Sequence, residues 1–140
     1  MWIRHDDRDQ TLSRLVLLCQ DDTGYLNLKQ LVSRSYQQGQ IADRPTIASE
    51  WLEGKTDGLI ALSAALDGDI GQAIRAGNPQ LAETYLQEWL RLFPNRFFLE
   101  LQRTGRPFEE PYIQQAVEMS RQFAVPVVAS NDVRYIDASD

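Results

Sequence analysis

The sequence predicts an α/β fold in which strands alternate with helices, and three observations support this class. Short apolar runs recur along the chain and are bounded by turn residues, as buried strands are. Between the runs lie longer segments with the helical periodicity of a face that packs on a core. The alternation of the two kinds of segment is typical of β/α units, so we expect mostly parallel strands.

The first half of the chain contains three predicted strands and two predicted helices. Residues 2–3 and the apolar run 15–19 are strands that can pair as a hairpin with a long loop. A helix is expected over residues 21–39, because Gly39 is a suitable stop. A shorter helix is predicted at residues 47–52, and residues 59–63 form the next buried strand.

The second half repeats the pattern with three helices and two strands. A short helix is predicted over residues 69–76, and Asn78 followed by Pro79 marks the start of the next, which ends near residue 92. Strands at residues 97–101 and 125–129 flank a helix that begins at Pro107. The buried face of this last helix is expected to consist of Ile113, Ala116, Val117, Ser120 and Ala124.

Composition limits the classes of function. The 140 residues carry a net charge of −6, which argues against a face that neutralises phosphates. Cys19 is the single cysteine, and we expect it in the core. His5, the single histidine, lies among charged residues, which is a poor basis for a metal or catalytic site. No apolar run approaches the ~20 residues that cross a bilayer, so a cytoplasmic protein is expected.

Candidate chemistry lies at the carboxyl ends of the predicted strands, where parallel β/α folds gather function. Asp132 follows the last strand and is either a ligand or general base, or else a turn residue paired with Arg134 or Arg103. The loop over residues 103–106 precedes a helix and either holds an anion or is simply solvated. The sequence contains no GxGxxG, Walker, GxSxG, HExxH or CxxC pattern.

Four segments of the chain together resemble a known family. They are DTGYLNL at residues 22–28, DGLIALS at 57–63, FLELQRTGRP at 98–107 and VVASNDVRY at 127–135. In their order and spacing they are similar to the PHP (polymerase and histidinol phosphatase) domain of the alpha subunits of bacterial DNA polymerase III. The resemblance implies a partial distorted β/α barrel. It also implies that residues 1–140 are one domain, a central slice of a PHP domain with both ends truncated.

The resemblance further implies a metal site that has been lost. Active PHP domains use metal ions for phosphoesterase or 3′–5′ exonuclease chemistry. Four family ligand positions fall at Arg14, Ala65, Asp132 and Arg134, and only Asp132 is a metal-binding residue type. We therefore expect no catalytic residue, metal or cofactor in this chain. Our hypothesis is that Asp132 pairs with Arg14 or Arg134 as a structural remnant.

The function implied by the resemblance is that of a scaffold. The parent protein would be a DNA-directed DNA polymerase, a nucleotidyltransferase that acts in DNA replication with Mg. This slice would be non-catalytic and would dock the proofreading exonuclease subunit and other replicase subunits, with DNA contacted only through the parent and no membrane involved. The alternative is a metal-dependent phosphoesterase or 3′–5′ exonuclease that uses Zn or Mn. An unrelated α/β binding module is a third reading.

Overall fold

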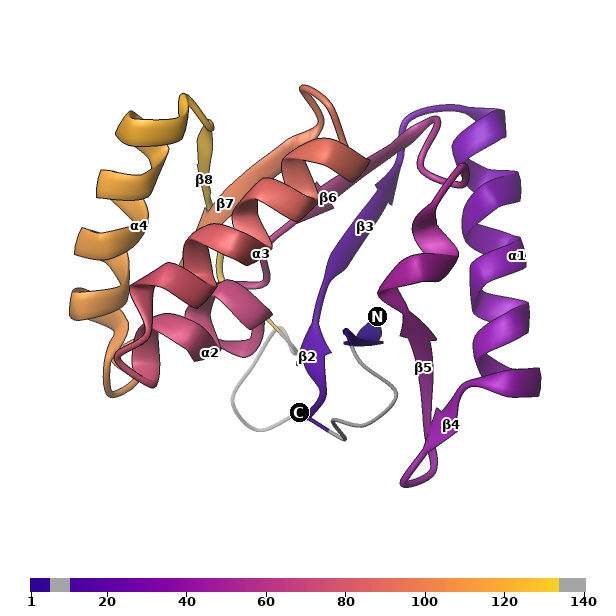
Figure 1. Ribbon diagram of the computed structural model, residues 1–140, viewed down its shortest axis with the longest axis horizontal. Helices are drawn as coiled ribbons and strands as arrows, with labels where there is room; N and C mark the ends of the chain where they lie inside the picture. Colours follow the sequence, from indigo (N-terminus) through magenta and orange to yellow (C-terminus); the bar gives the residue numbers. More distant parts are fainter. Residues whose placement is uncertain (6–10, 134–140) are drawn as a thin grey trace.

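The structure, a computed structural model, describes residues 1–5 and 11–133 of the chain (Figure 1). Its elements confirm the α/β class. In chain order they are β1 (Trp2–Arg4), β2 (Ser13–Arg14), β3 (Val16–Cys19), α1 (Asp22–Gln38), β4 (Gln40–Ile41), β5 (Arg44–Ala48), the 3-10 helix η1 (Ser49–Leu52), β6 (Leu59–Leu62), the 3-10 helix η2 (Ala65–Asp67), α2 (Asp69–Arg75), α3 (Pro79–Leu92), β7 (Phe97–Leu101), α4 (Glu109–Phe123) and β8 (Val127–Ala129).

The strands form two sheets that share one continuous stretch of chain. The sheet orders are β2-β1-β5-β4 and β3-β6-β7-β8. Only Leu15 separates β2 from β3, and Figure 1 shows the two strands running on from one another. Leu15 exchanges two backbone hydrogen bonds with Met1, of 2.9 and 3.0 Å, which extend the ladder between β1 and β2. Residues 13–19 therefore pair with β1 through their first half and with β6 through their second half.

The pairing is mixed, so the expectation of mostly parallel strands is wrong. Among the described residues, β1–β5, β6–β7 and β7–β8 are parallel, whereas β1–β2, β4–β5 and β3–β6 are antiparallel. One physical reason is the hairpin between β1 and β2, which reverses residues 13–19, so that β6 pairs with a reversed strand. The sequence predicted a hairpin of residues 2–3 with the run 15–19, but Ser13 and Arg14 pair with β1, whereas Val16–Cys19 pairs with β6. β4 and β5 form a further antiparallel pair.

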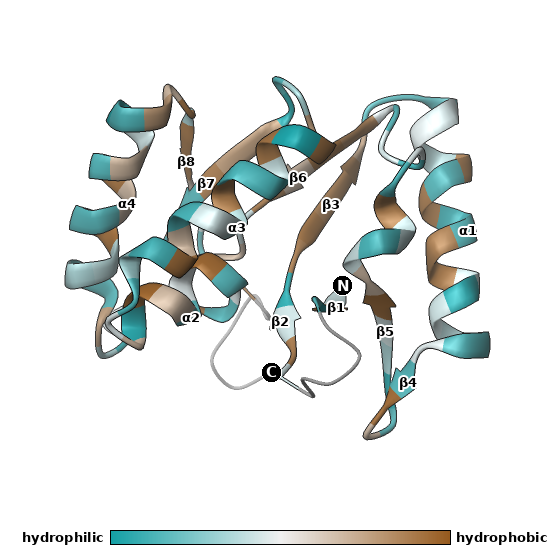
Figure 2. Ribbon diagram, in the orientation of Figure 1, coloured by the Kyte–Doolittle hydropathy of each residue, from teal (hydrophilic) through white to brown (hydrophobic). Residues whose placement is uncertain are grey.

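The helices cover the sheets with their apolar faces, and their ends follow the capping residues. The Asp21 side chain accepts a hydrogen bond from the Gly24 amide at the start of α1, and Asn78 accepts one from the Leu81 amide at the start of α3. Figure 2 shows hydrophobic residues along β3, β6 and β7 and alternating character along the helices. The main core includes Leu59, Leu86, Trp89, Phe97 and Leu99, all fully or almost fully buried. None of the described helices is long and apolar enough to cross a membrane.

Two local predictions differ in part from the structure. Of the short helix expected at residues 47–52, Ser49–Leu52 is helical, as the 3-10 helix η1, whereas Ile47 and Ala48 belong to β5. Thr46 and Ile47 are β-branched and lie beside β1, so a strand partner overrides the helical reading. The buried residues of α4 are Glu109, Tyr112, Ala116 and Met119. Tyr112 and Met119 are buried where Ile113 and Ser120 were expected, so the buried face lies about one residue earlier in the helix than predicted.

The two ends of the second sheet are more open than predicted. Cys19 is exposed at the end of β3 and is not a core residue. Val127 and Ala129 of β8 are also exposed. Both strands lie at the edges of their sheet, where only one neighbouring strand covers them. The apolar runs therefore predicted the positions of β3 and β8 correctly, but they overestimated the burial of these strands.

The segment DTGYLNL has a structural role in joining α1 to the loop before β6. Gly24 lies so close to Gly58 that a Cβ atom built on Gly24 would stand 1.9 Å from the Gly58 carbonyl oxygen. The Asn27 amide donates a 2.9 Å hydrogen bond to the Asp57 carbonyl, and the Gln20 amide donates one of 2.8 Å to the Gly58 carbonyl. The motif thus holds two backbone segments at a distance that excludes any side chain.

We expect Gly24→Ala to destabilise the protein by about 3 kcal/mol, because the added methyl overlaps backbone that cannot move as a flexible side chain does. The measurement is urea unfolding followed by circular dichroism. Thr23→Ala, at the exposed neighbouring position of α1, is the control and should change stability by no more than about 0.5 kcal/mol. Equal stabilities of the two variants would contradict the close contact.

Candidate functional site

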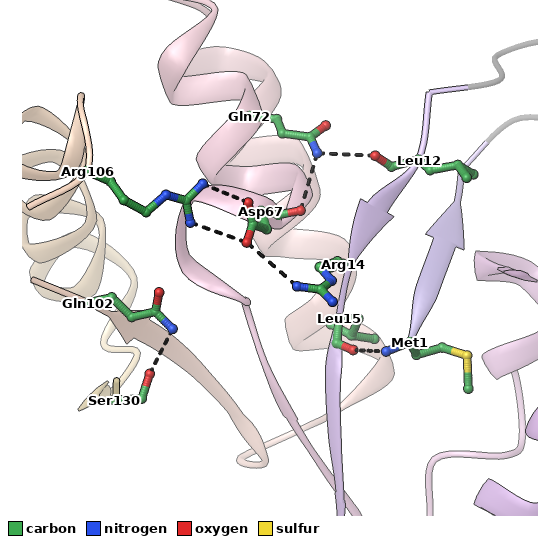
Figure 3. A network of polar contacts seen from close by, with 9 residues as sticks. All are labelled: Met1, Leu12, Arg14, Leu15, Asp67, Gln72, Gln102, Arg106 and Ser130. Atoms are coloured by element: carbon green, nitrogen blue, oxygen red, sulfur yellow. Dashed lines mark hydrogen bonds and ion pairs between the residues drawn. The ribbon is translucent and has the colours of Figure 1, made fainter. Parts of the chain in front are cut away.

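A polar hollow of about 620 Å³ brings together residues from distant parts of the chain. It lies where β1, β2 and β5 meet η2, α2, the loop before α4 and the segment after β8. Figure 3 shows part of its polar network. The residues that line the hollow are Trp2, Leu12, Arg14, Arg44, Asp67, Gln72, Arg106 and Asp132. Two of the four predicted site positions, Arg14 and Asp132, therefore face the same space.

Asp67 is the centre of the charged contacts in this hollow. Arg106 donates two hydrogen bonds to its carboxylate, of 3.0 and 3.3 Å, and Arg14 lies 3.9 Å from it (Figure 3). The hydrogen bonds to Asp67 raise the pKa of Arg106 above its ordinary value, and the charge of Asp132 acts in the same direction. Sequence reasoning missed Asp67. The only sequence feature that could have indicated a role for Asp67 was its position a few residues after the end of strand β6.

The hypothesised pair of Asp132 with Arg14 stays a prediction. The two residues line the hollow together, and the ion pair that Arg14 makes there is with Asp67. Asp132 is exposed and takes part in the electrostatics of Arg106. Arg134, the other proposed partner, lies outside the described residues. Among the described residues, the site is therefore a group of two carboxylates and three arginines, in which Asp67, Arg44 and Arg106 are additions to the predicted set.

Ala65, which the resemblance assigns to a family ligand position, is packed as an apolar residue. It is 2% exposed and lies in a small buried cluster with Leu66, Tyr112 and Ala116. Ala64 and Ala65 both adopt the left-handed conformation, with φ of 59° and 48°. This conformation costs an alanine roughly 1 kcal/mol, and it turns the chain sharply at the carboxyl end of β6.

A buried carboxylate lies beside the hollow, in an adjoining space of about 310 Å³. Glu100 is 5% exposed and accepts a hydrogen bond from the Ser130 hydroxyl, which in turn accepts one of 3.2 Å from the Gln102 amide. The Tyr112 hydroxyl donates a 2.7 Å hydrogen bond to the Glu100 carbonyl. Burial raises the pKa of Tyr112 to about 12, so this phenol remains a donor at neutral pH. The contacts tie the end of β7 to the segment that carries Asp132.

The loop over residues 103–106 does bind an anion, and the anion belongs to the chain. The Glu109 carboxylate accepts hydrogen bonds from the Thr104 amide at 2.8 Å, the Thr104 hydroxyl at 2.6 Å and the Gly105 amide at 2.9 Å. These donors, led by the Thr104 hydroxyl, hold the pKa of Glu109 below its usual value. Arg103 pairs instead with Glu110 at 2.7 Å. An external anion would have to displace Glu109.

His5 is more buried than its charged sequence neighbours suggested. Its Nε2 atom lies 2.6 Å from the Asp69 carboxylate, which also accepts a 2.8 Å hydrogen bond from the Trp89 indole. The imidazole stacks on Tyr85 with ring centroids 4.5 Å apart. This cluster ties the end of β1 to α2 and α3, so its evident role is to hold these elements together.

Comparison with known proteins identifies the family of the chain. A family model described as "PHP domain" matches residues 1–104, so the chain belongs to the PHP domain family. Its relatives include the DNA polymerase III subunit alpha of Pseudomonas fluorescens, 44% identical over 140 residues, and that of Escherichia coli K12, 46% identical over 129 residues. The same subunit of Vibrio cholerae is 37% identical over 134 residues. These comparisons confirm the resemblance drawn from the four sequence segments.

The matches include nearly the whole of this chain but only a small part of each relative. The matches span 100%, 92% and 96% of this chain and 12%, 11% and 12% of the three polymerase subunits. The similarity therefore concerns one limited region of a much longer protein.

The residues of the hollow do not fit the metal site that the family implies. Within residues 1–5 and 11–133, no group of three or more histidine, cysteine or carboxylate side chains is arranged to hold a metal ion. The resemblance assigns one ligand position to Arg14 and another to Ala65, and neither side chain is of a metal-binding type. The carboxylate of Asp67 is already engaged by two guanidinium groups. A metal ion would have to displace these cations.

We expect Glu109→Gln to lower stability at pH 7, with a loss that shrinks as the pH falls. Because the folded protein holds the pKa of Glu109 below its unfolded value, its contribution is complete above that unfolded value, near 4.5, and is lost as pH drops through the folded pKa. Urea unfolding at pH 7 and near pH 3 measures the effect. Glu110→Gln, at a more exposed carboxylate, should change little. A difference between Glu109→Gln and wild type that is independent of pH would contradict this account.

Proposed function

We propose that this chain is a non-catalytic PHP scaffold of the alpha subunit of a bacterial DNA polymerase III, and that it acts in the cytoplasm where the chromosome is replicated. The single observation that supports the lack of catalysis is the contact of Arg14 and Arg106 with Asp67 in the hollow. Fixed guanidinium groups stand where a metal-dependent enzyme needs a cation and open coordination positions. The two sheets of the chain, joined by residues 13–19, would form part of a distorted β/α barrel.

The physical reasoning concerns the charge that remains when metal ligands are lost. Carboxylates gathered around a space without a cation repel one another and are poorly solvated. Arginine supplies a permanent positive charge and binds a carboxylate through two hydrogen bonds, as Arg106 does with Asp67. The arrangement keeps the shape of the site without its chemistry.

The partners follow from the relatives' role as polymerase subunits. The scaffold would dock the proofreading exonuclease subunit and, through the rest of a long subunit, other parts of the replicase. A domain without its own exonuclease chemistry needs a separate protein to remove misincorporated nucleotides. DNA binding, Mg and nucleotidyl transfer would then belong to the remainder of the parent polymerase. The net charge of −6 supports a protein rather than a nucleic-acid contact for this region.

The metal content of the purified chain tests the loss of catalysis. We expect less than stoichiometric Zn or Mn by plasma mass spectrometry after dialysis against either metal, and no hydrolysis of a 3′-labelled oligonucleotide. The reason is the absence of a ligand set among the described residues. Stoichiometric metal together with cleavage that disappears in Asp132→Ala would overturn the proposal. It would establish a metal-dependent phosphoesterase or exonuclease instead.

Titration calorimetry with the cognate proofreading exonuclease subunit tests the docking role. We expect saturable binding of one exonuclease subunit per chain. Circular dichroism of the same sample shows that the chain is folded. A folded sample that does not bind the exonuclease subunit at all would contradict docking, while the family assignment would stand.

A further inference from the structure

One side of the polar hollow is made of an aromatic ring held between two arginines. The guanidinium carbon of Arg44 lies 4.7 Å from the centre of the Trp2 ring, and that of Arg14 lies 5.2 Å from it. The three residues come from β1, β2 and β5, which are paired strands of one sheet. We refer to Trp2, Arg14 and Arg44 as the Trp2 clamp. Its members are placed by backbone pairing, with Trp2 opposite Arg14 in the β1–β2 register.

The arginines of the hollow differ in how fully their charge is compensated. Arg106 makes two hydrogen bonds to Asp67. Arg14 reaches the same carboxylate only at 3.9 Å, the outer limit of an ion pair. Arg44 is exposed, and its contact in the described part of the chain is with the Trp2 ring rather than with a carboxylate. Among the described residues, three guanidinium groups and two carboxylates, Asp67 and Asp132, line the hollow, so these residues carry one positive charge in excess.

This geometry suits the recognition of a carboxylate. A guanidinium stacked on an aromatic face gains cation–π attraction, while the N–H groups along its edge stay free to donate hydrogen bonds. Two parallel N–H groups match the two oxygens of a carboxylate. Stacking also restrains the arginine side chain before binding, which reduces the entropy lost in the complex. Tryptophan and arginine are the residue types that most often dominate the binding energy of protein interfaces.

The balance of charge favours a protein ligand over a polyanion. One excess positive charge matches one carboxylate, whereas a nucleic acid brings a phosphate at every step and needs several cations. Asp67 and Asp132 line the same hollow and would repel a run of phosphates. Leu12 and the Trp2 ring supply apolar surface beside the charge. The fitting ligand is an acidic side chain with an apolar neighbour.

We propose that the Trp2 clamp binds an aspartate or glutamate that is flanked by apolar residues in a segment of a partner protein. The proposal deepens the docking role, on which its biological meaning rests, by assigning it a surface and a chemistry. Arg44 makes the principal contact and Arg14 the second. Trp2 holds both guanidinium groups in place and packs against the apolar flank.

A short peptide tests the clamp independently of any natural partner. The probe is an acetylated, amidated Leu-Asp-Leu peptide, and its matched control is Leu-Asn-Leu. The readout is the NMR signal of the Trp2 indole N–H, which is distinguished from those of Trp51 and Trp89 by substitution. We expect the Asp peptide to shift the Trp2 signal in a saturable manner and the Asn peptide to shift it at least tenfold less at equal concentration. The shift should disappear in Arg44→Glu.

The matched control variant is Arg121→Glu, which makes the same change of charge at an exposed position in the last turn of α4. It should respond to the Asp peptide as wild type does. Absence of any shift in wild type, or an equal shift in Arg44→Glu, would overturn the clamp. A single-stranded oligonucleotide that produces the same shift at lower concentration than the peptide would overturn the assignment to a protein carboxylate.

Titration of the exonuclease subunit then separates the clamp from the docking role. We expect Arg44→Glu to weaken that binding at least tenfold and Arg121→Glu to leave it within twofold of wild type. If wild type responds to the peptide but does not bind the exonuclease subunit, the docking role fails and the clamp stands. If wild type and Arg44→Glu bind the exonuclease subunit equally, the clamp does not serve that docking.

Discussion

The structure depends on a single stretch of backbone, residues 13–19, that belongs to two sheets at once. Its first half completes a ladder with β1 and its second half with β6. Since each sheet receives one edge from this stretch, neither can shift in register without moving the other. Arg14 lies near the junction of the two sheets. This position brings a side chain of the first sheet close to Asp67, which follows strand β6 of the second sheet. The polar hollow exists because these seven residues connect the sheets.

The hollow is polar and largely self-compensated. Asp67 is bound by arginines, and the amides of the 103–106 loop are occupied by Glu109. Glu100 accepts a partly buried hydrogen bond from the Ser130 hydroxyl. Together these contacts hold the carboxyl ends of β6, β7 and β8 close to one another. The exception is Arg44, which is exposed and stacked on Trp2. Arg44 therefore differs from Arg106, whose guanidinium group is held by the Asp67 carboxylate.

Several elements were predictable because their signals are local. Asp21 caps α1, and Asn78 with Pro79 starts α3, since capping depends on a few consecutive residues. The strands at β6 and β7 follow apolar runs for the same reason. The helix proposed at residues 47–52 begins only at Ser49, as η1, because Ile47 and Ala48 pair with β1, a strand distant in sequence. Asp67 and the burial of His5 were missed because their partners lie 39 and 64 residues away.

By itself the sequence determined the α/β class, the order of most helices and strands, and membership of the PHP family, because periodicity, caps and motif spacing are properties of neighbouring residues. The assignment of Arg14, Ala65 and Asp132 to family ligand positions stays a prediction from the resemblance. Only the tertiary structure decided the antiparallel pairing of β3 with β6, the engagement of Asp67 by Arg14 and Arg106, and the stacking of Arg44 on Trp2. Charges act through space, and which of them meet depends on how β1, β5 and η2 are brought together.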